Sequence, residues 1–168
     1  MGKRLTFKIG YGSHIPVLVK LLSITTGPVL ELGSGYFSTP VLHYLCSAQH
    51  RQLVTYENEP IIYDYMHQCE NKYHKVILVN GWDDCDIECP WDVALIDHAP
   101  AERRIVDVMR LSNWAKYIVC HDTSWKQDKH YHYKTIFPEF KYAFHYAEFN
   151  PGNTSVLSNL VDLNELSI

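Results

Sequence analysis

The feature of this sequence that most constrains its fold is the alternation of short apolar runs of strand length with longer segments of helical periodicity. Such alternation is typical of parallel βαβ units, with helices on both faces of the sheet. The expected strands are residues 29–32, 53–56, 75–79, 92–96 and 116–120. The expected helices begin near residues 15 and 40 and, further along, span residues 60–72 and 101–111.

Residues that favour helix starts precede the first two helices. Ser13 is expected to open the first helix, with Pro16 in its first turn, and Ser38 or Thr39 to cap the second, with Pro40 close behind. The last third of the chain has a different character. Residues 140–149 and 154–160 are two β-rich runs with no room for a helix between them, which predicts an antiparallel hairpin at the sheet edge. We expect one domain over residues 1–168.

Composition excludes several classes of protein. The 15 Lys and Arg are outnumbered by 19 Asp and Glu, and the formal net charge of −4 disfavours nucleic acid or anionic lipid as a partner. The apolar run at residues 15–22 is shorter than the ~20 residues of a membrane span and contains Lys20. No apolar segment follows residues 1–5, as it would in a signal peptide. We therefore expect a cytoplasmic protein with no membrane partner.

The five cysteines are odd in number and scattered, which favours reduced thiols over a disulfide framework. Cys85 and Cys89 form the one close pair. Because a structural zinc site usually has a second such pair, no metal is predicted there.

Polar residues gather where the expected parallel strands end. In an open α/β sheet, ligands bind beyond the carboxyl ends of the strands. Gly33 allows a sharp turn out of the first strand, and Gly35 leaves room for a ligand to approach the backbone. The bulky residues 36–37 stand where dinucleotide sites carry a third glycine, which suits a nucleoside without phosphates. The polar residues at these ends are Glu31, Glu57, Asp97, His98, His121 and Asp122.

Four segments together resemble the class I S-adenosylmethionine-dependent methyltransferases. They are residues 29–38, Tyr56 with Glu57, residues 91–97, and the closing hairpin. The resemblance implies an α/β, Rossmann-like, doubly wound and mostly parallel sheet of seven strands, with the seventh strand antiparallel between the fifth and the sixth. It also implies S-adenosylmethionine as the cofactor.

The resemblance also implies roles for individual residues near the cofactor. Glu57 would accept hydrogen bonds from the ribose hydroxyls, since a carboxylate is an acceptor for two donors. Trp82 would stack on the adenine, or else serve as a packing residue, while Asp83 or Asp84 accepts from the exocyclic amine. The segment that would cradle the methionine and ribose comprises Glu31, Gly33, Ser34 and Gly35.

Methyl transfer requires in-line positioning of the acceptor and removal of its proton. The candidate catalytic residues are Asp97, His98, His121 and Asp122, with His98 or His121 as the general base. Two other interpretations stay open. Asp97 can instead orient the cofactor, and Asp97, His121 and Asp122 can hold a divalent metal, although a metal is not favoured because metal-dependent relatives carry an acidic pair or Asp-Asn at residues 121–122.

The expected acceptor is a small molecule with an oxygen nucleophile, such as a sugar or a phenol. Residues 125–133 combine aromatic, imidazole and cationic side chains that suit such an acceptor, or form an amphipathic helix. Two other classes of function remain open. An NAD-dependent oxidoreductase would share the first turn and Glu57, and a noncatalytic nucleoside-binding or scaffold module would keep the glycines. A homo-oligomer is compatible with every alternative.

Overall fold

The computed structural model describes residues 9–148 and 153–168. In this part of the chain, seven strands form one sheet in the order β3-β2-β1-β4-β5-β7-β6. Strands β1 to β5 are parallel, and β7 pairs antiparallel with both β5 and β6. The strands are β1 (Val29–Leu32), β2 (Leu53–Glu57), β3 (His74–Leu78), β4 (Trp91–Ile96), β5 (Ala115–His121), β6 (Tyr142–Tyr146) and β7 (Thr154–Ser158).

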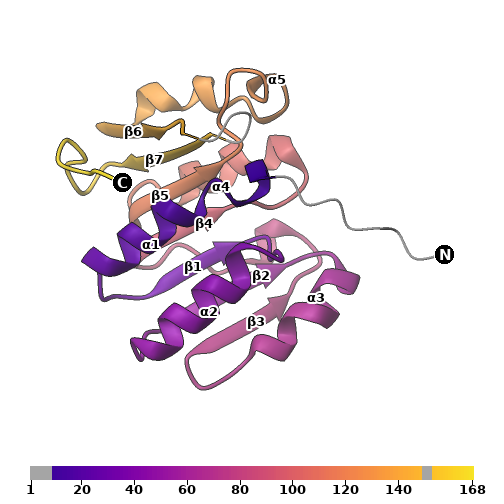
Figure 1. Ribbon diagram of the computed structural model, residues 1–168. Coiled ribbons are helices and arrows are strands. Elements are labelled where there is room, and N and C mark those ends of the chain that lie inside the picture. The colour runs from indigo at the N-terminus through magenta and orange to yellow at the C-terminus, as the bar shows by residue number, and fades with distance from the viewer. Residues whose placement is uncertain (1–8, 149–152) are drawn as a thin grey trace.

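Helices cover both faces of this sheet (Figure 1). One apolar cluster lies under α1 and α2, and includes Leu18, Leu42 and Val119. A second cluster, on the face toward α4, includes Trp82, Ile96 and Val108. The helices are α1 (Ile15–Ile24), α2 (Ser38–Ala48), α3 (Pro60–Met66), α4 (Arg104–Arg110) and α5 (Asp128–Tyr131). Among the described residues, no helix has the length and apolarity needed to cross a membrane.

The structure confirms the predicted fold class, including the antiparallel strand between β5 and β6. The C-terminal hairpin is present as β6 and β7. Its connecting residues 149–152, like the N-terminal residues 1–8, lie outside the described part of the chain.

Four predicted helix boundaries are wrong. Helix α4 begins at Arg104 and not at Ala101, because residues Ala101–Arg103 form a 3-10 turn before it. His14, rather than Ser13, precedes α1, and the Ser13 hydroxyl instead contacts Thr154 at 3.3 Å. Helix α2 begins at Ser38, so its N-cap is Phe37, and the hydroxyl of Thr39 donates to the buried carboxylate of Glu31 and caps no helix. Helix α3 ends at Met66 and continues as a 3-10 turn over His67–Cys69, after which the backbone becomes extended.

Candidate functional site

The candidate site lies at the edge where parallel strands β1, β2, β4 and β5 end. Strand order reverses here between β1 and β4. Gly33, just after β1, has a φ of +86°. A Cβ at this position would lie 2.5 Å from the Cα of His98, which follows β4. The two loops therefore touch backbone to backbone, and glycine is required at residue 33.

The carboxylate of Glu57 joins the loop after β1 to the loop after β2. Its Oε2 accepts hydrogen bonds from the backbone N–H and the hydroxyl of Ser34, at 2.8 and 2.7 Å. Its Oε1 accepts from the backbone N–H groups of Asn58 and Glu59, at 2.9 and 2.8 Å. Of these four donors, the Ser34 hydroxyl alone is a side-chain group that can rotate away. Glu57 thus holds both loops in place through backbone donors. The acceptor position on Oε2 that the Ser34 hydroxyl occupies can be taken by another hydroxyl donor.

Glu31 is fully buried beneath the glycine turn. Its carboxylate accepts from the hydroxyls of Thr39 and Thr55, at 3.0 and 2.7 Å. The hydroxyl oxygen of Thr39 in turn accepts from the backbone N–H of Gly35 at 2.9 Å. Burial raises the pKa of the Glu31 carboxyl to about 7, although hydrogen bonds from Ser38 and the two threonines favour its ionised form. Glu31 therefore acts on the turn through Thr39.

The hydrogen-bond network around Glu31 extends across the sheet to two histidines. Thr55 uses its one hydroxyl proton toward Glu31, so it must accept from Nε2 of His74, which lies 2.9 Å away. Burial lowers the pKa of His74 to about 4, which keeps the ring neutral. Its Nδ1 is then an acceptor for Nδ1 of His43 at 3.2 Å. These bonds define one direction of donation, from His43 toward Glu31.

Trp82 and Asp83, expected near the adenine, have different surroundings. The buried ring of Trp82 stacks on His98 with a centroid distance of 4.1 Å, and its Nε1 donates to the carbonyl of Ala99 at 2.7 Å. Asp83 is exposed and forms an ion pair with Arg103 at 2.8 Å. Trp82 is 4% exposed, so protein covers nearly all of its ring, and its role toward a ligand stays a prediction.

The four candidate catalytic residues form two separate groups. His121 Nδ1 lies 3.0 Å from Asp97 Oδ1 and 3.7 Å from a carboxylate oxygen of Asp122. The side chain of His98 points elsewhere, with its Nε2 3.0 Å from Asp107 Oδ2. Because successive residues at the end of a strand face opposite sides, Asp97 and His98 do not share one surface. The structure therefore brings Asp97, His121 and Asp122 together without the His98 ring.

Arg104 of α4 fixes this part of the edge. Its buried guanidinium lies 2.9 Å from Asp97 Oδ1 and donates to the backbone carbonyls of Asp97 and His98 at 2.8 and 2.6 Å. Burial opposes ionisation of Asp97, but His121 and Arg104 outweigh it and lower its pKa to about 2. Asp97 is therefore a rigid, ionised carboxylate.

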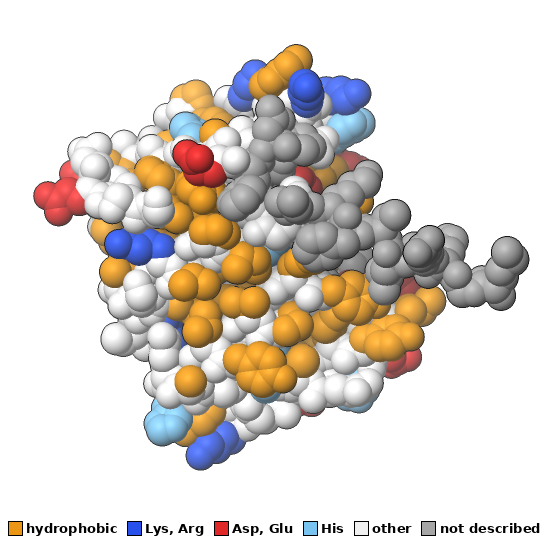
Figure 2. Space-filling model, in the orientation of Figure 1, with side chains coloured by type: hydrophobic (Ala, Val, Ile, Leu, Met, Phe, Trp, Pro, Cys, Tyr) orange, Lys and Arg blue, Asp and Glu red, His pale blue; other side chains and the backbone are white. Residues whose placement is uncertain are grey.

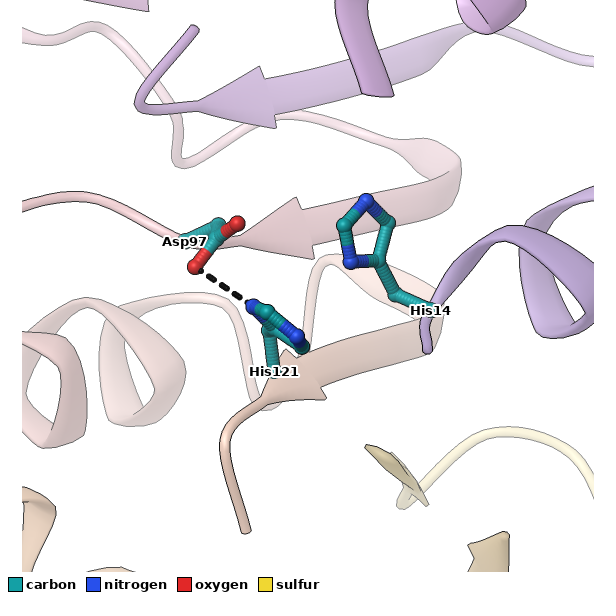
Figure 3. Close-up of side chains that lie close together, drawn as sticks. All are labelled: His14, Asp97 and His121. Atoms are coloured by element: carbon teal, nitrogen blue, oxygen red, sulfur yellow. Dashed lines mark hydrogen bonds and ion pairs between the residues drawn. The ribbon is translucent and has the colours of Figure 1, made fainter. Parts of the chain in front are cut away.

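Two residues before α1 complete the cluster, and sequence reasoning missed both as site residues. Ser13 Oγ lies 3.1 Å from His121 Nε2, and the carbonyl of Gly10 lies 3.3 Å from the same nitrogen. The ring of His14 meets that of His121 edge to face, with centroids 4.5 Å apart (Figure 3). The adjacent Ser13 and His14 at a helix start were the available signal, but nothing in the sequence places them beside β5.

Residues 122–131 attach helix α5 to the same edge. Asp122 has a φ of +60°, and its carboxylate accepts from the hydroxyl of Tyr131 at 3.1 Å. The Arg104 guanidinium lies 4.6 Å from the centre of the Tyr131 ring. Trp125 is 72% exposed, with the Lys126 ammonium 5.5 Å from its ring. The segment thus offers an exposed aromatic ring and a cation next to the site.

Comparison with protein-family models finds no match, and comparison with curated proteins finds none. Several solved structures are similar in fold. Rv0187 from MTB, solved with cofactor bound, has a TM-score of 0.67 at 18% identity, over 95% of this chain and 84% of its own. The METTL16 MTase domain has a TM-score of 0.62 at 12% identity, over 95% of this chain and 71% of its own.

One of these likenesses corrects the expectation that nucleic acid is disfavoured as a partner. The catalytic domain of hMettl16, solved in complex with the MAT2A 3'UTR hairpin 1, has a TM-score of 0.60 at 9% identity, over 98% of this chain and 74% of its own. Net charge is a sum over the whole chain, whereas binding depends on the local field at one surface. A net charge of −4 is therefore no argument against nucleic acid.

Sheet order and structural likeness agree on the architecture. The order β3-β2-β1-β4-β5-β7-β6, with β7 antiparallel, is the one that the sequence resemblance implied. The similar structures are methyltransferase domains and match nearly all of this chain. The chain therefore has the fold of a class I S-adenosylmethionine-dependent methyltransferase domain.

Proposed function

We propose that this chain binds S-adenosylmethionine at the ends of β1 and β2 and transfers its methyl group to an acceptor beside Asp97 and His121. The observation that carries the proposal is the pairing of Glu57 with Ser34, at 2.8 and 2.7 Å, directly after the glycine turn. Two similar structures support it, since METTL16 was solved in complex with SAH and Rv0187 with cofactor bound.

The residues around this edge fit a nucleoside cofactor. A Cβ added at Gly35 would have no neighbour nearer than the Ser38 hydroxyl at 3.7 Å, and one at Gly81 would meet nothing within 4 Å. Both loops therefore have open space at their backbone. A ribose hydroxyl can replace the Ser34 hydroxyl on Glu57, because the hydroxyl rotates while the backbone donors stay.

The positions of these residues indicate a role for each of them. When bound, S-adenosylmethionine supplies an activated methyl group, so the protein's main task is orientation. Glu57 and Ser34 would hold the ribose, and the backbone at Gly35 would line the methionine end. Asp97, held by Arg104 at 2.9 Å, and His121 would orient the acceptor. The assignment of a general base among these residues stays a prediction.

We expect Glu57→Gln to weaken binding of S-adenosylhomocysteine by about 100-fold. A hydrogen bond to a charged group contributes roughly 1.5–3 kcal/mol, and the amide loses both the charge and one acceptor. Isothermal titration of the purified chain measures this loss. The control is Glu59→Gln, which removes the same charge from an exposed neighbour and is expected to leave affinity unchanged.

Equal weakening by both variants would contradict the ribose role of Glu57. Thermal unfolding of each variant without ligand separates lost affinity from lost fold. If the folded wild-type chain binds NAD and not S-adenosylhomocysteine, the oxidoreductase alternative replaces the methyltransferase proposal.

The acceptor class is a separate question. A hydroxyl on a small molecule matches the polar pair of Asp97 and His121. Nucleic acid is the second candidate, and a specific observation favours it, namely the exposed Trp125 with Lys126 beside its ring. Figure 2 shows basic and hydrophobic side chains gathered at the top of the molecule, in the region of α5. Aromatic rings next to cations are typical of surfaces that stack single-stranded bases.

We expect Trp125→Ala to weaken binding of single-stranded RNA by about tenfold, since stacking contributes roughly 1–3 kcal/mol per base. Fluorescence anisotropy with a labelled oligonucleotide measures this. The matched control is Trp114→Ala, which removes a 41% exposed ring. Trp114 precedes the amino end of β5, whereas the candidate site lies at the carboxyl ends of the strands. Transfer of labelled methyl groups to phenols or sugars, with no RNA binding, would instead select the small-molecule acceptor.

A further inference from the structure

Two imidazoles and a carboxylate converge where α1 begins and β4 and β5 end. His14, Asp97 and His121 each offer one atom that can bind a metal, a ring nitrogen or a carboxylate oxygen, and these three atoms lie within 4.8 Å of one another. Figure 3 shows the His14 ring extending from the start of α1 toward the other two side chains. His14 and His121 are buried, while Asp97 is partly exposed. The group is therefore enclosed by protein on the histidine side and open beside Asp97.

His14 has an environment that packing alone does not explain. Its side chain is 1% exposed, and neither ring nitrogen has a hydrogen-bond partner among the described residues. A buried polar group without a partner costs roughly 1–3 kcal/mol. A metal ion would satisfy one of these nitrogens, because neutral imidazole is a common metal ligand.

The other two side chains can each offer a metal-ligand atom. His121 has partners for both ring nitrogens, Asp97 on Nδ1 and Ser13 and Gly10 on Nε2. When one nitrogen binds a metal, the other keeps a partner that orients the ring, as in known metal sites. Asp97 binds His121 and Arg104 through Oδ1, which leaves Oδ2 for an ion.

We propose that His14, Asp97 and His121 bind one divalent transition-metal ion of the zinc class. Two imidazoles and one carboxylate suit Zn²⁺, Co²⁺ or Fe²⁺, whereas Mg²⁺ prefers oxygen ligands in an octahedron. With metal–nitrogen bonds of about 2.0–2.1 Å, two ligands of a tetrahedral ion lie roughly 3.4 Å apart, so a pair of ligand atoms at the 4.8 Å limit closes in by about 1.4 Å on binding. The open side at Asp97 leaves a coordination position for water or another small oxygen ligand. The site uses only the chain's own side chains, and it shares Asp97 and His121 with the proposed acceptor site, but metal binding can be measured without methyl transfer.

The test is titration of the chelator-treated chain with Zn²⁺, Co²⁺ and Mg²⁺ separately. We expect one Zn²⁺ or Co²⁺ per chain, a Co²⁺ absorption spectrum typical of nitrogen ligands, and no Mg²⁺ binding in the same range. His14→Phe keeps a ring of similar shape without donor atoms, and is expected to lower Zn²⁺ affinity by more than ~100-fold, since the loss of an outer-shell partner alone costs 10–100-fold. His43→Gln is the control, because His43 and His74 form the other close imidazole pair.

The variants also report on folding. Because His14→Phe removes two unpartnered nitrogens, its midpoint of thermal unfolding in chelator should equal or exceed that of the wild type. Zn²⁺ should raise the midpoint of the wild type and of His43→Gln, but not that of His14→Phe. Undiminished Zn²⁺ affinity in His14→Phe, or loss of binding in His43→Gln, would overturn the proposal. X-ray absorption of the zinc-loaded wild type provides a readout that needs no variant. Two imidazoles are expected, and none or one would refute the site.

Discussion

Gly33→Ala is expected to lower the free energy of unfolding by about 4 kcal/mol or more. The new Cβ would lie 2.5 and 2.6 Å from the Cα and N of His98, which are backbone atoms and have little freedom to move. The φ of +86° adds a conformational cost of roughly 1–2 kcal/mol for any residue with a Cβ. Both loops are fixed, since Gly33 N–H donates to the carbonyl of Tyr56 and Asp97 N–H to that of Leu32. Urea unfolding followed by circular dichroism measures the loss.

Gly35→Ala is the matched control for this prediction. Its added Cβ has ordinary van der Waals contact only, at 3.7 Å from the Ser38 hydroxyl. We expect stability within about 1 kcal/mol of the wild type, together with weaker S-adenosylhomocysteine binding if the backbone there lines the cofactor. The interpretation of Gly33 would be refuted if Gly33→Ala were as stable as Gly35→Ala.

Glu31→Gln is expected to gain about 3 kcal/mol of stability relative to the wild type as the pH rises from 4.5 to 7.5. The folded pKa of about 7 lies above the ordinary glutamate value of 4.5, so in this range the folded wild type keeps a proton that the unfolded chain loses. The contribution of Glu31 to the free energy of unfolding of the wild type therefore falls as the pH rises, and it levels off above pH 7. Gln has no proton to lose, and its amide can still bond to Thr39 and Thr55.

The quantity to measure is the difference between the two stability curves, from urea unfolding in chelator at several pH values. The wild-type curve alone is not sufficient, because buried His74, with a pKa of about 4, contributes with the opposite sign in the same range. Glu102→Gln, at an exposed position, is the control and should give a curve parallel to that of the wild type. A parallel curve for Glu31→Gln as well would show that Glu31 is ionised at its ordinary pKa.

Much of the fold was predictable because its elements are defined locally. The apolar runs that became β1, β2, β4 and β5 each end in a polar residue or next to one, and this pattern predicted the sheet edge where the candidate site lies. The hairpin followed from two β-rich runs with too few residues between them for a helix. The helix boundaries were less predictable, because Ser13 contacts Thr154, 141 residues away, and Thr39 bonds to Glu31, in place of capping a helix.

The parts of the site that escaped prediction depend on contacts between distant segments. His98 follows Asp97 directly, yet its ring contacts Trp82 and Asp107 on the other side of the loop. His14 lies more than a hundred residues before His121 and reaches it through the packing of α1 against β5. Neither arrangement is encoded by a motif, since each requires knowing which strands are neighbours.

The contact between Ser13 and Thr154 also determines when the site is completed during folding. These residues are 141 positions apart, and Thr154, the first residue of β7, pairs with His121 at the end of β5. Contacts of such sequence separation carry a large loop-closure entropy and form after local ones. During synthesis the N-terminal segments emerge first, so the contact of Ser13 with Thr154 forms only after β7 has left the ribosome. A nascent chain that ends before β7 can therefore hold the parallel sheet without the strand whose Thr154 contacts Ser13 beside His121.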